Sequence, residues 1–124
     1  MAAPPIFIVD DDTDLREVLG ELLSCEGWAP QLCANGRDAL DRLRGGARPR
    51  VILLDLMMPE MDGWQFRQEQ LRDAALRDIP VVVMTASPGL ADRASLAGAE
   101  ILEKPVGLAE ILGAVERHAL RASA

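Results

Sequence analysis

The sequence predicts an α/β fold in which a doubly wound, five-stranded parallel sheet is covered by helices on both faces. Short apolar segments typical of buried strands alternate with amphipathic segments typical of helices along the whole chain. Three of the apolar segments have no polar alternation, as expected for strands that are buried on both faces. The alternation of strand segments with helix segments favours right-handed βαβ crossovers in one sheet.

Each strand segment is assigned from its apolar residues and from the residues that end it. The second segment contains Pro30, which lacks an amide donor and suits the edge of a sheet. The fifth segment is short, which also favours an edge position. The expected strands are residues 6–9, 29–33, 51–54, 81–84 and 101–102.

The helices are assigned from capping residues and apolar periodicity. Asp12 or Thr13 can cap the first helix, which Gly27 ends, and Asn35 can cap the second, which ends at Gly45 and Gly46. A third helix is expected at about residues 64–72, a short one at roughly 90–96, and a last amphipathic helix over 108–119.

The strand order follows from these assignments. The continuous apolar segments are the first, third and fourth, so these strands are expected in the centre, with the second and fifth at the edges. The resulting order is 2-1-3-4-5, the flavodoxin-like variant of the doubly wound fold.

The chain of 124 residues suits one domain, expected over residues 1–124 with a core from about 5 to 121. Aromatic residues make up only 3% of the sequence, so aliphatic side chains must supply the core. Cys25 and Cys33 lie in apolar surroundings without metal-ligand spacing, and we expect both to be buried, reduced thiols.

Charge and hydropathy exclude several classes of partner. The net charge of −7 argues against a nucleic-acid partner, and we interpret the arginines at 42, 44, 48 and 50 as a solvated loop face. No apolar segment approaches the length of a membrane span, and residues 1–5 lack the regions of a signal peptide. We expect a cytoplasmic protein with neither a membrane nor a nucleic-acid partner.

Polar residues follow four of the predicted strands. Asp10 and Asp11 follow the first, Asp55 the third, Thr85 the fourth and Lys104 the fifth. The carboxyl ends of parallel strands meet at one edge, where such folds bind ligands. Clustered carboxylates need a cation, and oxygen ligands in an incomplete cage suit Mg²⁺. With a hydroxyl and an ammonium donor, the set predicts phosphoryl transfer onto Asp55.

At these residues the chain resembles the receiver domain of two-component response regulators over nearly its whole length. Each motif alone is weak, but the ordered set is specific. The matching motifs are the acidic pair Asp10 and Asp11, the run DLMMPEMDG at residues 55–63, Thr85 with Ala86, and Lys104 with Pro105.

The resemblance implies a role for each residue of the acidic site. Asp55 would be the phosphoacceptor. Asp11 and Asp55 would bind Mg²⁺ directly, together with the backbone carbonyl of Met57, and Asp10 would act mostly through bound water. Mn²⁺ is the alternative cation.

The resemblance also implies the partners. Thr85 and Lys104 would contact the phosphoryl group, and the peptide bond from Lys104 to Pro105 would be cis. The donor would be a phosphohistidine on a histidine kinase or a histidine phosphotransfer protein. His118, the one histidine of the sequence, is interpreted as a helix-end surface residue far from the site. We expect no enzymatic activity beyond self-phosphorylation and slow dephosphorylation. We also expect a free-standing domain that signals to a downstream protein by contact or onward phosphotransfer. The alternative is a receiver domain cut from a longer protein.

Ile101 departs from the family pattern. Members of the family often carry Tyr or Phe three residues before the lysine, and that ring moves inward as the Thr85 position approaches the phosphoryl group. Isoleucine cannot repeat this movement, so the switch position is expected to work differently, or the domain to act as a relay.

Two other functions are compatible with parts of the sequence. A receiver-shaped adaptor that is never phosphorylated is one. The intact acidic pair, with Asp55, Thr85 and Lys104, argues against it, but Ile101 leaves it open. A haloacid-dehalogenase-like phosphatase is the other, because residues 10–13 resemble its D-x-D-x-T motif. Asp14 stands where that motif has Thr, however, and Asp55 would then have no role.

Overall fold

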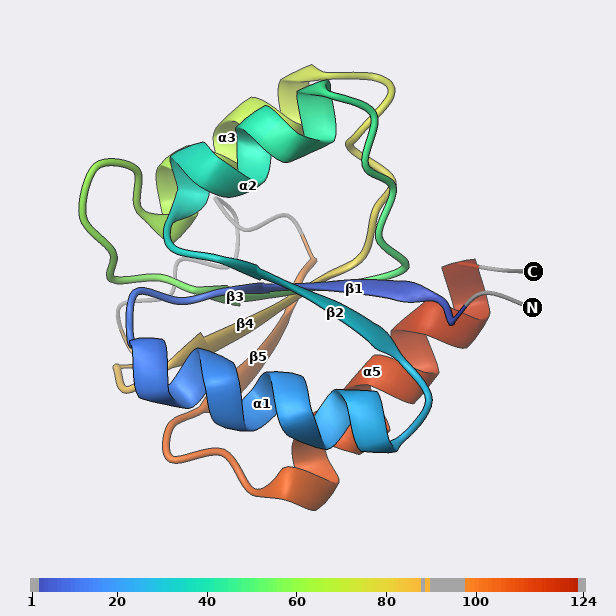
Figure 1. Ribbon diagram of the computed structural model, residues 1–124. Helices are drawn as coiled ribbons and strands as arrows, with labels where there is room; N and C mark the ends of the chain where they lie inside the picture. The colour runs from blue at the N-terminus through green and yellow to red at the C-terminus, as the bar shows by residue number, and fades with distance from the viewer. Residues whose placement is uncertain (1–2, 88, 90–97, 123–124) are drawn as a thin grey trace.

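In the computed structural model, five parallel strands form one sheet in the order β2-β1-β3-β4-β5, which confirms the predicted fold (Figure 1). The structure describes residues 3–87, 89 and 98–122, so the helix expected at residues 90–96 lies outside the described residues. The strands are β1 (Pro5–Val9), β2 (Ala29–Cys33), β3 (Ile52–Asp55), β4 (Val81–Thr85) and β5 (Glu100–Glu103), and the helices are α1 (Thr13–Cys25), α2 (Gly36–Arg44), α3 (Gly63–Arg72) and α5 (Leu108–Ala122).

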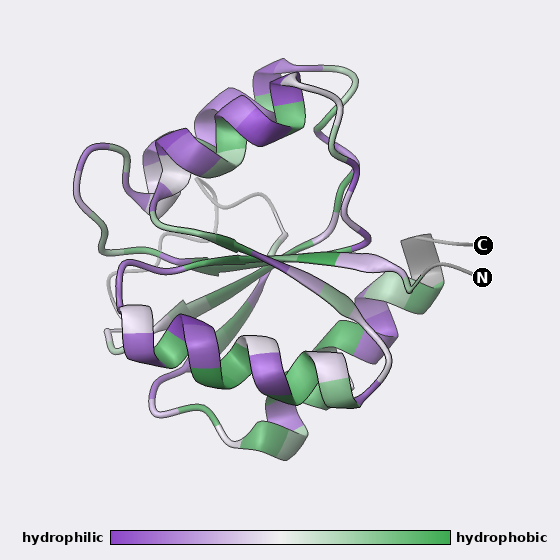
Figure 2. Cartoon of the chain, viewed as in Figure 1, coloured by the Kyte–Doolittle hydropathy of each residue, from purple (hydrophilic) through white to green (hydrophobic). Residues whose placement is uncertain are grey.

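Helices cover both faces of the sheet. α2 and α3 pack on one face, and α1 and α5 pack on the other (Figure 1). Successive strand residues point to opposite faces, so Phe7 and Val9 enter the core under α2 and α3, whereas Ile6 and Ile8 enter the core under α1 and α5. Figure 2 shows the strands as mostly hydrophobic and the outer helix surfaces as largely hydrophilic. Burial on both faces explains why the central strand segments lack polar alternation.

Side-chain caps begin three of the helices. Asp12 caps α1 by accepting a hydrogen bond from the amide of Leu15, and Asn35 caps α2 in the same manner. Asp62 and Gln65 form a reciprocal capping box at α3, which therefore begins at Gly63, one residue before the expected start.

The loop between β3 and α3 is anchored at both ends. The amide of Gly36 donates to the carbonyl oxygen of Met61 at 3.1 Å, and the amide of Gly63 donates to that of Leu56 at 2.9 Å. A Cβ atom at Gly63 would lie 2.8 Å from the carbonyl oxygen of Asp55, so a larger residue would force the loop away from β3. The anchored loop keeps the end of β3 in place.

The structure corrects two expectations about single residues. Cys33 is buried, and burial raises the pKa of its thiol to about 12, but Cys25 at the end of α1 is exposed, not buried. His118 is only 19% exposed, and its Nε2 atom lies 2.8 Å from Oε1 of Glu100. Packing of α5 against β5 therefore makes His118 a partly buried, paired residue.

None of the helices in the described part of the chain combines the length and the apolar character that crossing a membrane requires.

Candidate functional site

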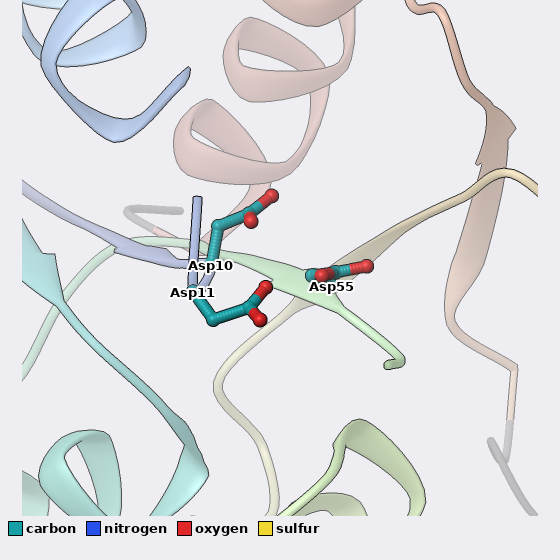
Figure 3. A group of neighbouring side chains, drawn as sticks. All are labelled: Asp10, Asp11 and Asp55. Atoms are coloured by element: carbon teal, nitrogen blue, oxygen red, sulfur yellow. The ribbon is translucent and has the colours of Figure 1, made fainter. Parts of the chain in front are cut away.

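Three carboxylates from two neighbouring strands meet at the carboxyl edge of the sheet. Asp10 and Asp11 follow β1, and Asp55 ends β3 (Figure 3). One carboxylate oxygen of each lies within 4.8 Å of those of the other two. Asp10 is 0% exposed and Asp55 is 6% exposed, whereas Asp11 is open to solvent. The site therefore has two buried acids and one acid at its mouth.

Two groups hold the carboxylate of Asp10 in a fixed orientation. Its Oδ1 atom accepts a hydrogen bond from the amide of Asp12 at 2.9 Å, and its Oδ2 atom accepts one from Nζ of Lys104 at 3.0 Å. Asp12 supplies the helix cap described above, so capping does not account for Asp10 or Asp11. The acidic run thus contains one capping residue, one oriented buried acid and one exposed acid.

Lys104 connects the two buried acids. Its Nζ atom lies 3.0 Å from Oδ2 of Asp10 and 3.5 Å from Oδ1 of Asp55. Burial alone would lower the pKa of Lys104, but the hydrogen bonds and charges of both carboxylates raise it above its ordinary value. Lys104 is therefore charged at neutral pH and has donor capacity to spare.

The backbone places Thr85 beside Lys104. Thr85 is buried at the end of β4, and its carbonyl oxygen accepts the amide of Lys104 at 2.7 Å. Its Oγ atom accepts the amide of Ser87 at 3.0 Å, which fixes the side chain. The peptide bond between Lys104 and Pro105 is cis, in agreement with the resemblance. The site thus combines a hydroxyl, an ammonium and three carboxylates.

The three carboxylates together carry more negative charge than the single positive charge of Lys104 offsets. Burial, followed by the charge of Asp10, raises the pKa of Asp55 to about 6, although Lys104 and the amide of Met57 act in the opposite direction. A divalent cation would relieve this repulsion, and hard carboxylate oxygens with an open, solvent-facing side suit Mg²⁺. The residues present therefore fit a magnesium site.

A model of the family described as the response regulator receiver domain matches residues 6–116. The chain belongs to this family. The receiver domain is 43% identical over 110 residues to Response regulator MprA of Mycolicibacterium vanbaalenii. The aligned region covers 86% of this chain and 46% of that protein. It therefore spans about half the length of the curated relatives that it matches.

Solved receiver domains have the same fold. The signal receiver domain of a histidine kinase from Syntrophus aciditrophicus is 30% identical, with a TM-score of 0.82 over 96% of this chain and 92% of that chain. The receiver domain of the sensor histidine kinase PA1611 from Pseudomonas aeruginosa PAO1 is 28% identical, with a TM-score of 0.84 over 95% and 98%. That structure has a magnesium ion coordinated in its active site cleft.

Two of the predicted site residues of this receiver domain, Met57 and Ile101, lie outside the group of carboxylates. Met57 follows Asp55 in the anchored loop, and its side chain is 63% exposed. Ile101 lies opposite Val83 in the pairing of β4 with β5, partly buried against the core under α2 and α3. Ile101 therefore does not line the carboxylate cluster, whereas Met57 borders it.

Arg16 also supports the site, although its position in the sequence did not predict this role. Its Nη1 atom donates to the backbone carbonyl of Asp10 at 2.6 Å, and its Nη2 atom donates to Oγ of Thr13 at 3.2 Å. The guanidinium therefore ties the first turn of α1 to the segment that carries the acidic pair. The one indication in the sequence was a positively charged residue in the first turn of a helix that directly follows three acidic residues.

Replacing Arg16 by Met is expected to weaken Mg²⁺ binding by roughly tenfold, because residues that orient metal ligands contribute on that scale. The affinity would be measured by following amide signals during a Mg²⁺ titration. Arg37→Met removes the same charge from an exposed position on α2 and serves as the control. A purely electrostatic role would instead raise the affinity for Mg²⁺ slightly in both variants, so equal changes in the two would contradict an orienting role for Arg16.

Proposed function

We propose that this receiver domain takes a phosphoryl group from a partner phosphohistidine onto Asp55 in a Mg²⁺-dependent reaction and loses it slowly by hydrolysis. The observation that carries the proposal is the buried carboxylate of Asp55, with Lys104 3.5 Å away and Asp10 and Asp11 beside it. Membership of the receiver family supports it.

The proposed reaction uses Asp55 as the nucleophile. A carboxylate oxygen of Asp55 attacks phosphorus, the bond between phosphorus and the imidazole nitrogen breaks, and the bonding electrons stay with the donor imidazole. Water later attacks the aspartyl phosphate and releases inorganic phosphate. Lys104 and the hydroxyl of Thr85 would each meet a phosphoryl oxygen. Because the pKa of Asp55 is about 6, its nucleophilic form predominates at neutral pH.

Asp11, Asp55 and the backbone carbonyl of Met57 are the proposed direct ligands of Mg²⁺, with Asp10 acting through water. The engagement of both carboxylate oxygens of Asp10, by Asp12 and Lys104, supports its indirect role. When bound, the cation offsets the negative charge of the phosphoryl oxygens. Mn²⁺ is the proposed alternative because it favours the same oxygen ligands.

A second protein is the proposed source of the phosphoryl group. An apolar depression of about 400 Å³ lies beside Lys104, between α1 and the start of α5. Two of its lining residues, Val18 and Leu108, are 55% and 52% exposed, which suits contact with another protein. His118 contacts Glu100 at the opposite end of β5, so it is badly placed to donate. A histidine kinase or histidine phosphotransfer protein supplies the donor in this proposal.

Incubation with acetyl phosphate and Mg²⁺ tests the proposal. Intact mass measurement is expected to show one labile phosphoryl adduct, formed with Mg²⁺ and absent after chelation. If no adduct forms with either Mg²⁺ or Mn²⁺, the adaptor alternative is favoured instead.

The proposed output is contact with a downstream protein or onward phosphotransfer, without an aromatic switch. Ile101 is partly buried against the core and has no ring to exchange between two positions. A phosphate mimic is therefore expected to shift amide signals near Thr85 more than those near Ile101. Large shifts across β5 and α5 would contradict this prediction.

A further inference from the structure

Two adjoining depressions lie at the amino-terminal edge of the sheet, opposite the carboxylate cluster. Their volumes are about 300 and 310 Å³, and they share the wall formed by Asp78, Ile79 and Pro80. We call them together the amino-edge cradle, which is defined by this wall, by Arg48 and Arg50 on one side, and by Arg67, Arg77 and His118 on the other.

The cradle is cationic in a chain whose net charge is −7. Asp78 is the one carboxylate among the described residues that line it. His118 also faces Glu100, which pairs in addition with Nη2 of Arg117 at 2.6 Å. Four guanidinium groups are thus set against one lining carboxylate, the reverse of the balance at the other edge.

Part of the cradle is built and rigid. Arg67 is only 6% exposed, and its Nη1 atom donates to Oε1 of Gln70 at 2.7 Å. Gln70 in turn donates to the carbonyl oxygens of Leu76 and Ile79, at 2.9 and 3.0 Å. Burial lowers the pKa of Arg67. Arg67 is therefore held in place against the shared wall.

Two other arginines are available to a ligand. Within the described part of the chain, the side chains of Arg50 and Arg77 form no ion pair or hydrogen bond. Arg50 is partly buried, and Arg77 is exposed on the other side of the wall. Arg48 is already oriented by bonds from its Nη1 atom to the carbonyl oxygens of Leu43 and Ala47. Each depression thus contains one oriented arginine and one without a partner.

We propose that the amino-edge cradle binds a small ligand with two phosphate groups, one in each depression. Guanidinium groups recognise phosphate through paired hydrogen bonds, and depressions of this size suit small ligands. Apart from the imidazole of His118, the described lining contains no aromatic ring, so recognition depends on the phosphates and not on a stacked base.

The ligand would give the domain an input separate from Asp55. Gly98 and Ala99 line the cradle directly before β5, the strand that carries Ile101. Occupancy would therefore act on the beginning of the strand at which the family pattern is broken.

A titration of the full chain with inorganic pyrophosphate, without Mg²⁺, tests the proposal by amide signals. We expect shifts confined to the residues that line or adjoin the cradle, namely 48–50, 67, 75–81, 98–100 and 118. We also expect an affinity at least about tenfold higher than for inorganic phosphate, since two sites are filled at once. Shifts centred on residues 10–13, or equal affinities for the two anions, would overturn it.

Variants separate the cradle from general charge. Arg50→Gln and Arg77→Gln are each expected to weaken pyrophosphate binding by about tenfold, as loss of a charged hydrogen bond does. Arg37→Gln makes the same charge change on α2, near the opposite edge, and should leave the affinity unchanged, as should Asp55→Asn. Equal weakening by Arg37→Gln would refute the proposal, whatever the outcome at Asp55.

Discussion

Asp55→Asn is expected to abolish the phosphoryl adduct formed with acetyl phosphate and Mg²⁺. Asparagine keeps the shape of the side chain but removes the carboxylate oxygen that must attack phosphorus. Each other acid of the cluster has a different position or partner, since Asp10 is held by Asp12 and Lys104 and Asp11 is exposed. No substitute nucleophile is expected, and intact mass measurement of the variant should show only the unmodified chain.

Asp10→Asn provides the decisive contrast. In the proposal Asp10 acts on Mg²⁺ through water, and its carboxylate also pairs with Lys104, so this variant should form the adduct more slowly but still on Asp55. The phosphatase alternative makes Asp10 the nucleophile and predicts the reverse, with an adduct that survives in Asp55→Asn and disappears in Asp10→Asn. Peptide mapping of the trapped adduct would identify the modified carboxylate directly.

Without Mg²⁺, Asp55→Asn is expected to be more stable than the wild type by about 2 kcal/mol at pH 8, taking each unit of pKa shift as about 1.4 kcal/mol and discounting for relaxation. The folded-state pKa of Asp55, about 6, lies above its ordinary value of 3.8. The folded protein therefore binds the proton more tightly than the unfolded chain does. The stabilisation of the wild type by this tighter proton binding is complete below about pH 4. It is lost as the pH rises to 6 and stays lost above pH 6.

Urea unfolding from pH 4 to 8 would measure this effect as the difference between the two proteins. The gap should widen between pH 4 and 6 and then remain constant. Asp41→Asn removes an exposed carboxylate of α2 and should leave the pH dependence of the wild type unchanged. Saturating Mg²⁺ should stabilise the wild type more than Asp55→Asn. A constant gap across the whole pH range would show that burial does not disfavour the charged form of Asp55.

Much of the fold was predictable because the strands are buried on both faces. The unbroken apolar segments marked the central strands, and Pro30 marked the edge at β2. The meeting of Asp10, Asp55, Thr85 and Lys104 followed from one topological rule, since the carboxyl ends of parallel strands share an edge.

Other features depend on tertiary packing and could not be read from local pattern. Cys25 closely follows Leu22 and Leu23 in the sequence, yet as the last residue of α1 it lies at the surface. His118 acquires Glu100 as a partner only because α5 packs against β5. Arg16 acts through a backbone carbonyl, a group that every residue has and no motif marks.

The anchored loop between β3 and α3 separates the residues that hold the fold from a residue that borders Asp55. Hydrogen bonds donated by the amides of Gly36 and Gly63 fix its two ends. Between them the backbone amide of Met57 contacts Asp55, and the side chain of Met57 is exposed. Exchanging Met57 changes which atoms border the acceptor while the fold remains held by other residues. Because the side chain of Met57 is exposed, its substitution is expected to change the surroundings of Asp55 at little cost in stability.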